Sequence, residues 1–259
     1  MIKRMMDEDY FKMPGVSNSY LSRLAKCPAN ALIPLEQTPA MALGSALHCL
    51  ALEGMEEFNK RFAVSPLCDK RTTVGKACFA EFEATVGNKT IVTLEQLQTI
   101  SGMAESIATH PTASQLIQGG QVETAFTWEE DGVECKGKAD YFTSSCLIDL
   151  KSTSDASERK FSRSVTDFLY HNQFAFYRSG LASNGVFPSN FLIIAVESKP
   201  PYPCAVYELD DDMLSWGEAG YKHLLARHKA CVEAQSFPAY TNAGIITLRP
   251  PSWVSEYLE

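Results

Sequence analysis

The texture of the sequence changes at about residue 121, and this change limits the folds that the chain can adopt. Earlier residues repeat apolar side chains at helical spacing. From residue 122, three short runs rich in β-branched and aromatic residues follow one another: VETAFTW, VECKGKADYF and CLIDLKST. A helical pattern returns over 165–182, two strands are expected at FLIIAVES and CAVYELD, and a long amphipathic helix covers 210–234. This order predicts an α/β fold with a mixed central sheet flanked by helices.

The first 120 residues are mainly helical in pattern. Ser17 or Asn18 offers an N-cap for the first helix, Gly54 ends the second, and Pro111 ends the last. These expected helices cover 16–26, 43–53, 77–86 and 94–110, and the basic, turn-like run 69–76 precedes the third. We predict a single domain over 1–259, with a helical part at 1–120, a sheet core at 121–210, and a C-terminal helix and tail at 211–259.

The composition is that of a folded globular protein. Apolar residues make up 45% and charged residues 21% of the 259 residues, and no run approaches the roughly 18 apolar residues that a membrane span requires. The charged start, Met1 to Tyr10, lacks a signal-peptide stretch, so we expect a cytoplasmic protein without membrane contact. Eight cysteines without a C-x-x-C spacing argue against zinc ribbons and redox motifs, and predict reduced thiols.

The stretch GKADYFTSSCLIDLKST, residues 137–153, predicts a hairpin that gathers charged side chains. A turn centred on Ser144-Ser145 places Asp140 opposite Asp149. Because side chains alternate along a strand, Lys151 shares a face with Asp149, and Leu150 points into the core. The hairpin alone therefore brings two carboxylates and an ammonium group together.

Two adjacent carboxylates repel each other unless a cation neutralises them, and oxygen ligands favour Mg²⁺ or Mn²⁺. A metal ion there polarises a phosphoryl oxygen and activates water, while the Lys151 ammonium orients that water and screens developing charge. This chemistry is phosphodiester hydrolysis. The alternative is a solvated salt-bridge ladder on an edge strand. The apolar neighbours of Asp149 count against that alternative, because buried carboxylates seldom lack a partner.

The order G-x-x-D at 137–140, I-D-L-K-S-T at 148–153 and Q-x-x-x-Y at 173–177 resembles the core of the PD-(D/E)XK nuclease superfamily. LGSALHCLALE, at 43–53, is similar to the histidine helix of its RecB-like branch. SNSYLSRLAKCPA and AVESKPPYPCAVYELDD extend the resemblance to the exonuclease VIII (RecE) nuclease domains of phages and prophages, which resemble lambda exonuclease. The resemblance implies a restriction-endonuclease-like fold and a magnesium-dependent 5′-to-3′ exonuclease of linear double-stranded DNA in a bacterial host cell.

Carried over residue by residue, the resemblance implies a metal site and a catalytic lysine. Asp140 and Asp149 correspond to the metal-binding acids, Lys151 to the catalytic lysine and His48 to the histidine beside the metal. Leu150, between the acid and the lysine, is counted among the metal ligands. Two Mg²⁺ ions are expected, about 4 Å apart as in other two-metal sites. Mn²⁺ is expected to substitute for Mg²⁺, and Ca²⁺ to inhibit.

A fourth acid and a helical pair complete the expected site. Glu123 lies on a strand just upstream of the hairpin, whereas Glu53 follows His48 by five positions, about 140° further round an α-helix. We therefore prefer Glu123 as the ligand. Gln173 and Tyr177 are one helical turn apart on one face. Gln173 is expected to be catalytic, and Tyr177 either contacts DNA or belongs to the core.

The net charge of −8 and the pI of about 5.2 exclude a protein that coats DNA with its whole surface, but they leave room for a locally basic path. Hydroxyl and guanidinium groups near a helix start suit a terminal 5′ phosphate. The basic run before the third helix either contacts phosphates along the duplex or is a solvated surface. The expected residues are Ser17, Ser19 and Arg23 for the 5′ phosphate, and Lys70, Arg71 and Lys76 for the duplex.

The resemblance also implies partners. We expect a closed homo-oligomeric ring, a trimer or tetramer, with DNA ends entering its channel, and a RecT-type single-strand annealing protein acting on the 3′ tail. Two other functions stay open: a structure-specific or nicking endonuclease on the same core, and a DNA-end-binding module whose site has decayed. Loss of a core acid or of the lysine would mark the decayed module, and none is missing here.

Overall fold

The central sheet has seven strands within residues 1–34, 38–240 and 244–250, the parts of the chain that this computed structural model describes. Their spatial order is β1-β5-β6-β7-β8-β9, with β2 beside β6. The β7–β8 and β2–β6 pairs are parallel and the others are antiparallel, so the predicted mixed α/β fold is confirmed. The strands are β1 (Ile2–Arg4), β2 (Val16–Ser17), β5 (Gln121–Glu130), β6 (Val133–Phe142), β7 (Cys146–Thr153), β8 (Asn190–Glu197) and β9 (Cys204–Glu208).

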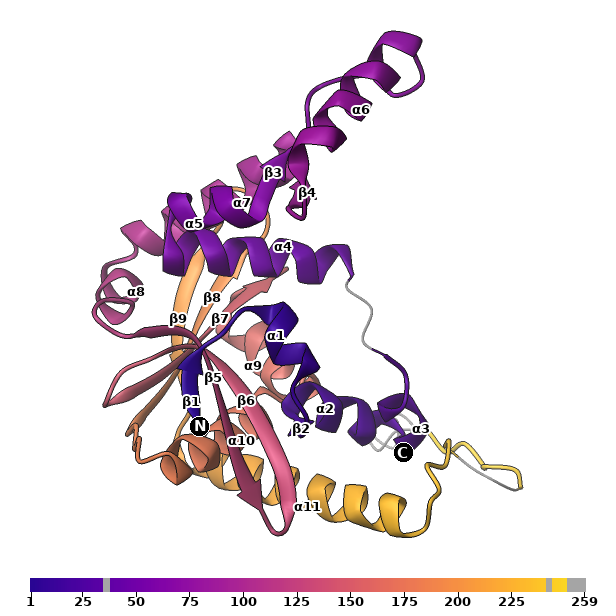
Figure 1. Ribbon diagram of the computed structural model, residues 1–259. Coiled ribbons are helices and arrows are strands. Elements are labelled where there is room, and N and C mark those ends of the chain that lie inside the picture. The colour runs from indigo at the N-terminus through magenta and orange to yellow at the C-terminus, as the bar shows by residue number, and fades with distance from the viewer. Residues whose placement is uncertain (35–37, 241–243, 251–259) are drawn as a thin grey trace.

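Helices cover both faces of this sheet (Figure 1). Helices α4, α7 and α8 pack on one face, and α2, α9, α10 and α11 pack on the other. No helix among the described residues has both the length and the apolar character to cross a bilayer. The helices are α1 (Asp7–Lys12), α2 (Asn18–Lys26), α3 (Pro28–Ala31), α4 (Pro39–His48), the π-helix η1 (Cys49–Glu53), α5 (Met55–Arg61), α6 (Thr73–Val86), α7 (Leu94–Thr109), α8 (Pro111–Leu116), α9 (Glu158–Asp167), α10 (Tyr170–Ser183) and α11 (Asp211–Glu233).

Alternate side chains of β7 pack into the two apolar cores, one on each face of the sheet. Leu147 packs into the core under α10, whereas Ile148 and Leu150 pack into the core under α7. All three are about fully buried, and full burial of such a side chain contributes roughly 1.5–3 kcal/mol. Register is therefore strongly fixed, because a slip by one residue would exchange the two faces. This fixes the charged residues of β7 as well.

Several predicted helix boundaries are confirmed. The Ser17 side chain accepts a hydrogen bond from the Tyr20 N–H and caps α2, and α7 and α11 begin and end close to their predicted positions. Gly54, with φ of 87°, ends the second predicted helix. That helix begins earlier than predicted, at Pro39, because Thr38 supplies the N-cap. Its last turn is the π-helix η1, which the pattern did not predict.

Other predictions were wrong in detail. The helix expected over 165–182 is two helices, α9 and α10, separated by Leu169 in the left-handed conformation. The third helix, α6, begins at Thr73 behind the Thr72 cap, so part of the run taken as a turn is helical. The short elements β1, α1 and α5 were not predicted. Of the tail after Pro238, the described parts, 239–240 and 244–250, contain no helix or strand, and 251–259 lies outside the described residues.

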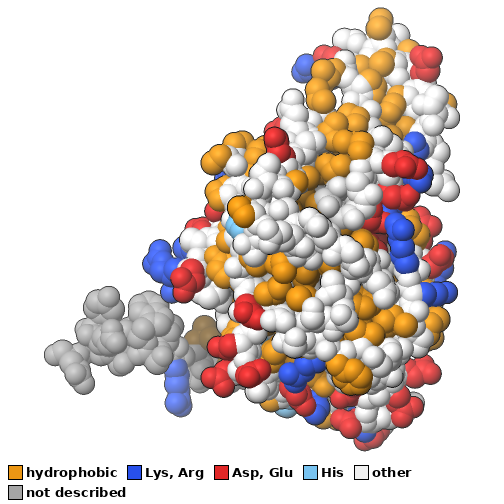
Figure 2. Space-filling view, turned by 90° about the vertical axis from the view of Figure 1, so that its left-hand side faces the viewer, with side chains coloured by type: hydrophobic (Ala, Val, Ile, Leu, Met, Phe, Trp, Pro, Cys, Tyr) orange, Lys and Arg blue, Asp and Glu red, His pale blue; other side chains and the backbone are white. Residues whose placement is uncertain are grey.

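Helix α6 projects from the body as an arm, at the top of Figure 1. The arm, residues 65–89, rises from a two-stranded parallel sheet of β3 (Phe62–Val64) and β4 (Thr90–Val92). Leu67 and Val74 on the arm are 86% and 81% exposed. Figure 2 shows apolar side chains along the arm together with charged ones. The arm therefore leaves much of its apolar surface exposed to solvent.

Helix α10 approaches β5 closely at a glycine, and this contact generates a stability prediction. A Cβ atom at Gly180 would lie 2.6 Å from a ring atom of Trp128 and 2.7 Å from one of Phe126. Gly180→Ala should lower the free energy of unfolding, because overpacking costs roughly 1–3 kcal/mol and the gain in helix propensity is at most about 1 kcal/mol.

The matched control is Gly44→Ala in α4, where the added Cβ meets nothing within 4 Å. Chemical denaturation should find this variant as stable as the wild type or more stable. An equal or greater stability for Gly180→Ala would contradict the packing described here.

Candidate active site

The candidate site lies where two neighbouring strands separate. Along one edge of β6, β2 pairs with Cys135 and Lys136, and β7 pairs with Tyr141 and Phe142. The predicted hairpin register is confirmed at these two β7 pairs, Tyr141–Ile148 and Phe142–Leu147. The ladder ends there, one position before Asp140 and Asp149. Residues 137–140 of β6 therefore have no strand partner on this edge within the described chain, and the sheet opens.

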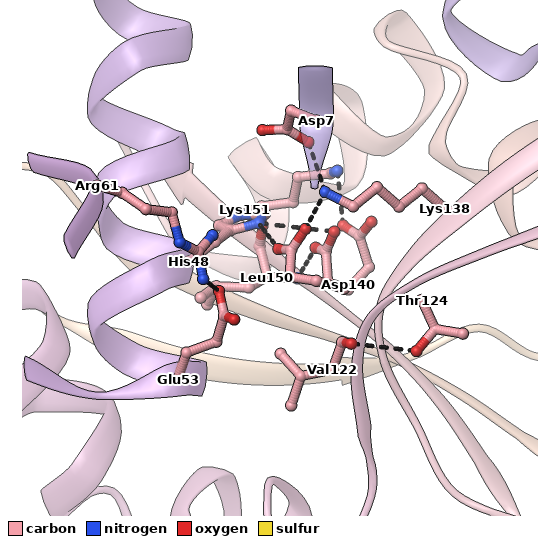
Figure 3. Close-up of polar contacts among 12 residues, drawn as sticks. Asp7, His48, Glu53, Arg61, Val122, Thr124, Lys138, Asp140, Leu150 and Lys151 are labelled. Atoms are coloured by element: carbon pink, nitrogen blue, oxygen red, sulfur yellow. Dashed lines mark hydrogen bonds and ion pairs between the residues drawn. The ribbon is translucent and has the colours of Figure 1, made fainter. Parts of the chain in front are cut away.

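Side chains satisfy the backbone groups that this opening exposes (Figure 3). The Leu150 N–H donates a hydrogen bond of 2.9 Å to Asp140 Oδ2, and the Leu150 carbonyl accepts one of 2.8 Å from His48 Nε2. A buried peptide group without partners is costly, so these two bonds hold the strands apart in a defined geometry. The predicted ligand Leu150 thus lies at the centre of the site through its backbone, while its side chain is in the core.

Three potential ligands lie together on the α4 side of the opening. His48 Nδ1 is 3.5 Å from Asp140 Oδ1 and 3.7 Å from Glu123 Oε1, and one donor atom of each residue lies within 4.8 Å of the other two. With Nε2 donating to Leu150, a neutral His48 keeps its Nδ1 lone pair free toward the two carboxylates. One imidazole nitrogen and two carboxylate oxygens suit a divalent cation such as Mn²⁺ or Mg²⁺.

Glu123 reaches this group through a distorted backbone. The β5–β6 pairs on either side, Val122–Tyr141 and Thr124–Ala139, put Glu123 level with Asp140. Its φ is 48°, which is uncommon for a residue other than glycine and costs energy. The Met5 N–H donates to the Glu123 carbonyl and holds this conformation. The strand is therefore locally destabilised in a conformation that points the Glu123 carboxylate toward Asp140 and His48.

Asp149 belongs to a second group on the other face of β7. Asp149 Oδ2 is 2.6 Å from Lys151 Nζ, as expected from their shared face, and Asp149 Oδ1 accepts a 2.6 Å hydrogen bond from Gln173 Nε2. Lys151 also donates to Gln173 Oε1 at 3.5 Å. Asp149 is 4% exposed, so it is not part of a solvated ladder. Leu150 joins this group to the His48 group.

The charges in the two groups shift one another's pKa. Burial would lower the pKa of His48, but Asp140 and Glu123 together raise it to about 9. Burial raises the pKa of Asp140 to about 6, against the opposing effect of His48. Burial also opposes ionisation of Glu123, yet His48 and Lys138 lower its pKa to about 2. For Lys151 the effect of Asp149 and Asp140 exceeds that of burial, and its pKa is raised.

Sequence reasoning missed Lys138. Its ammonium pairs with both Glu123 and Asp7, and its side chain is 10% exposed. The signal was present in the sequence, because Lys138 and Asp140 repeat on β6 the two-residue spacing of Asp149 and Lys151. The neighbouring Lys136 donates to the carbonyls at the end of α1, so β6 also anchors the helix that carries Asp7.

The choice between Glu123 and Glu53 has a different physical reason from the predicted one. Glu53 lies in the π-helix η1, so the 140° rotation of a regular α-helix does not apply to it. Figure 3 shows its carboxylate in contact with Arg61. Its carboxylate, with 2% of the side chain exposed, is instead occupied by Arg4 and Arg61. Glu53 is therefore a buried ion-pair partner beside the site.

The residues predicted to contact DNA lie in three places. Ser17 and Ser19 have their hydroxyls 3.0 Å apart at the start of α2, and the Nε of Arg23 is buried without a hydrogen-bond partner in the described chain. The basic residues are on the arm, which lies away from the β6–β7 opening in Figure 1. There Lys70 lies over the Phe79 ring, Arg71 pairs with Asp69, and Lys76 is exposed.

Tyr177 lies beside the opening rather than on the surface. Its ring packs edge-on against Phe126, with ring centroids 5.5 Å apart, and its hydroxyl lies against the backbone of Lys138. Burial raises its pKa well above the usual value. This environment agrees with the core alternative, and it leaves the tyrosine close to both acidic groups.

Comparison with known proteins gives the same fold. A crystal structure of a candidate exonuclease from Eubacterium rectale superimposes with a TM-score of 0.65 over 98% of each chain at 14% identity. A structure of an alkaline exonuclease from Laribacter hongkongensis covers 88% of this chain and 95% of its own, at 14% identity, but its TM-score of 0.36 is too low to compare the folds. We found no match among curated proteins.

An open mixed sheet with acids and a lysine at the point of opening is the arrangement of a PDDEXK-like domain. Residues 17–247 match a family described as a PDDEXK-like domain of unknown function (DUF3799). The chain belongs to this family.

The pKa of His48 generates a prediction about metal binding. Below pH 9 the metal-free protein keeps a proton on His48, and below pH 6 also one on Asp140, so a cation must displace protons in order to bind. The affinity should rise as the pH rises from 6 to 9, by up to about tenfold per pH unit for each displaced proton.

Calorimetric titration with Mn²⁺ at several pH values, in buffers of different ionisation enthalpy, measures affinity and proton release together. His48→Asn should remove most of the dependence above pH 7, whereas His223→Asn, at an exposed position on α11, should keep it. An affinity that does not change with pH in the wild type would contradict the proposed ligand set.

Proposed function

We propose that the protein is a magnesium-dependent exodeoxyribonuclease that digests linear double-stranded DNA from its 5′ ends. The observation that carries the proposal is the opening between β6 and β7, where the Leu150 peptide joins a possible metal site to a lysine held beside a buried carboxylate. Membership of a PDDEXK-like family supports the same chemistry.

The residues of the site would have different roles in hydrolysis. Glu123, Asp140 and His48 Nδ1 would hold a divalent cation, which supplies Lewis-acid chemistry to a phosphodiester when bound. Lys151 remains an ammonium because Asp149 and Asp140 raise its pKa, so it can orient a water molecule and stabilise charge on the phosphate oxygens. Gln173 holds the Asp149 carboxylate in place. We expect two Mg²⁺ ions per site, with Mn²⁺ able to substitute.

The finer features of the proposal come from the resemblance to exonuclease VIII. They are release of mononucleotides, a 3′ single-stranded tail for phage-type homologous recombination, a RecT-type annealing partner and action in the cytoplasm of a bacterial host. The Ser17–Ser19 hydroxyl pair and Arg23 are proposed to bind the 5′ phosphate, because a buried guanidinium nitrogen without a partner suits an anion.

A structure-specific or nicking endonuclease is the second candidate, since the same residues cut either kind of substrate. Covalently closed circular DNA separates the two, because an exonuclease needs an end. A catalytically silent end-binding module is disfavoured because Asp140, Asp149 and Lys151 are all present and in contact with partners.

Substitution of Asp149 or Lys151, the two charged residues of the second group, tests the catalytic assignment. Asp149→Asn and Lys151→Ala should each lower the turnover of linear duplex about a hundredfold or more, because they remove stabilisation specific to the transition state. Asp212→Asn, at an exposed position on α11, is the matched control and should retain activity.

The substrate for this test is a linear duplex with one blocked 5′ end and a label on each strand, incubated with Mg²⁺. Digestion of only the strand with the free 5′ end agrees with the proposed polarity. Wild-type turnover in folded Asp149→Asn or Lys151→Ala would refute the catalytic assignment.

A second prediction concerns assembly. We propose that the chain forms a trimeric or tetrameric ring, in which Lys70, Arg71 and Lys76 line a channel for duplex DNA. The exposed apolar residues of the arm support an interface there, because exposed apolar patches commonly mark contacts between subunits. Light scattering over the micromolar range should give three or four chain masses. A strict monomer that degrades long duplexes processively would rule out the ring.

A further inference from the structure

A stack of two aromatic rings leads from the catalytic lysine to the surface. Lys151 Nζ lies 4.8 Å from the centre of the Tyr170 ring, and the Phe168 ring stacks on Tyr170 with centroids 5.8 Å apart and planes tilted by 25°. Tyr170 is partly buried, whereas Phe168 is 61% exposed. A large apolar ring is thus held in solvent one ring away from the site.

The backbone at this point is held in an unfavourable conformation. Leu169, between the two aromatic residues, has φ of 57° and ψ of 39°, in the left-handed region that residues other than glycine rarely adopt. Its N–H donates to Thr166, and the Phe168 N–H donates to Ser164, so the turn is hydrogen-bonded to α9. Strain of this kind concentrates at functional sites, and here it keeps Phe168 stacked on Tyr170.

Helix α9, which leads into the stack, exposes three cations, called here its basic side, together with two acids, Glu158 and Asp167. Arg159, Lys160 and Arg163 of α9 are exposed, and none forms an ion pair within the part of the chain that the structure describes. The buried residues of α9, Phe161 and Val165, attach it to the core. In a chain of net charge −8, three exposed cations against two acids leave α9 with a net positive charge that can complement a polyanion.

We propose that Phe168, supported by Tyr170, stacks on a nucleobase at the DNA end, while the basic side of α9 contacts the phosphates of the same strand. This inference rests on the proposed nuclease function and adds the surface that holds the substrate. Successive phosphates of one strand advance about 3.4 Å along the axis, so a strand with a phosphate at Lys151 brings a neighbouring base to the exposed ring. Stacking is tolerant of sequence, because every base has an aromatic face.

The test measures stacking and affinity on DNA that is not cut. The probe is a linear duplex with nuclease-resistant phosphorothioate linkages at both 5′ ends and the fluorescent base 2-aminopurine at one of the first positions. Wild-type protein should quench the probe at one position. Phe168→Ala should abolish that quenching and weaken binding about 5- to 100-fold, whereas Phe168→Trp should retain both.

The matched control is Phe187→Ala. Phe187 is 72% exposed and precedes β8, at the end of the sheet opposite to Lys151, so its loss should leave quenching and affinity unchanged. For the basic side, Arg163→Gln should reduce the slope of log affinity against log salt by about 0.9 for one lost phosphate contact. Lys229→Gln, whose lysine lies beside the β5–β6 turn, should not change the slope.

The outcomes separate this inference from the proposed function. Wild-type affinity and quenching in Phe168→Ala, or no quenching by the wild type at any position, would overturn the stacking proposal even if hydrolysis proceeds. Quenching that depends on Phe168, in a protein without hydrolytic activity, would support the stack and overturn the nuclease assignment instead.

Discussion

The separation of β6 from β7 is the constraint on which the site depends. An ordinary antiparallel ladder would continue past Tyr141–Ile148, pair the backbones beyond Asp140 and Asp149, and close the sheet. Instead, the Leu150 N–H donates a hydrogen bond to the Asp140 carboxylate, and the Leu150 carbonyl accepts one from the His48 imidazole. These two bonds replace what a strand would supply, so the sheet opens without leaving buried peptide groups unpaired. The functional side chains are therefore part of the structural solution.

The carboxylates of the site depend on neighbouring cations. Asp140, Asp149 and Glu123 are gathered in a poorly solvated region, and each ionised carboxylate there needs a compensating charge. Lys151 forms an ion pair with Asp149, and Lys138 forms one with Glu123. His48 lies between Asp140 and Glu123 and, when protonated, compensates both carboxylates. A divalent cation entering the His48 group would take over the role of the histidine proton. In the metal-free protein, Asp140 and Glu123 raise the pKa of His48.

Much of the sheet could be predicted from the sequence. The alternation of apolar and polar side chains and a short turn together determine how two strands of a hairpin pair. That was enough to predict Lys151 and Asp149 on one face and Leu150 in the core. The Q-x-x-x-Y pattern singled out Gln173, but it did not predict the contact of Gln173 with Asp149. The arm was not predicted, because its helical pattern says nothing about whether the helix packs on the body.

The remaining features depend on tertiary contacts that no local pattern records. The positive φ of Glu123 is held by a hydrogen bond from the distant Met5, and the π-helix η1 and the left-handed Leu169 interrupt helices whose apolar pattern continues through them. The two-residue spacing of Lys138 from Asp140 is visible in the sequence. Its partners Asp7 and Glu123 are not, because they approach Lys138 only in the folded chain. Such positions break local rules, as functional sites commonly do.

We propose that the opened sheet holds a divalent cation between His48, Glu123 and Asp140. The most direct measurement is an anomalous difference map from crystals grown with Mn²⁺, recorded for the wild type and for Asp140→Asn. The map of the wild type should contain a peak in contact with the Asp140 and Glu123 carboxylate oxygens and with His48 Nδ1, and the map of the variant should lack it. Fully bound Mn²⁺ elsewhere in the wild type, with none between these three residues, would contradict it.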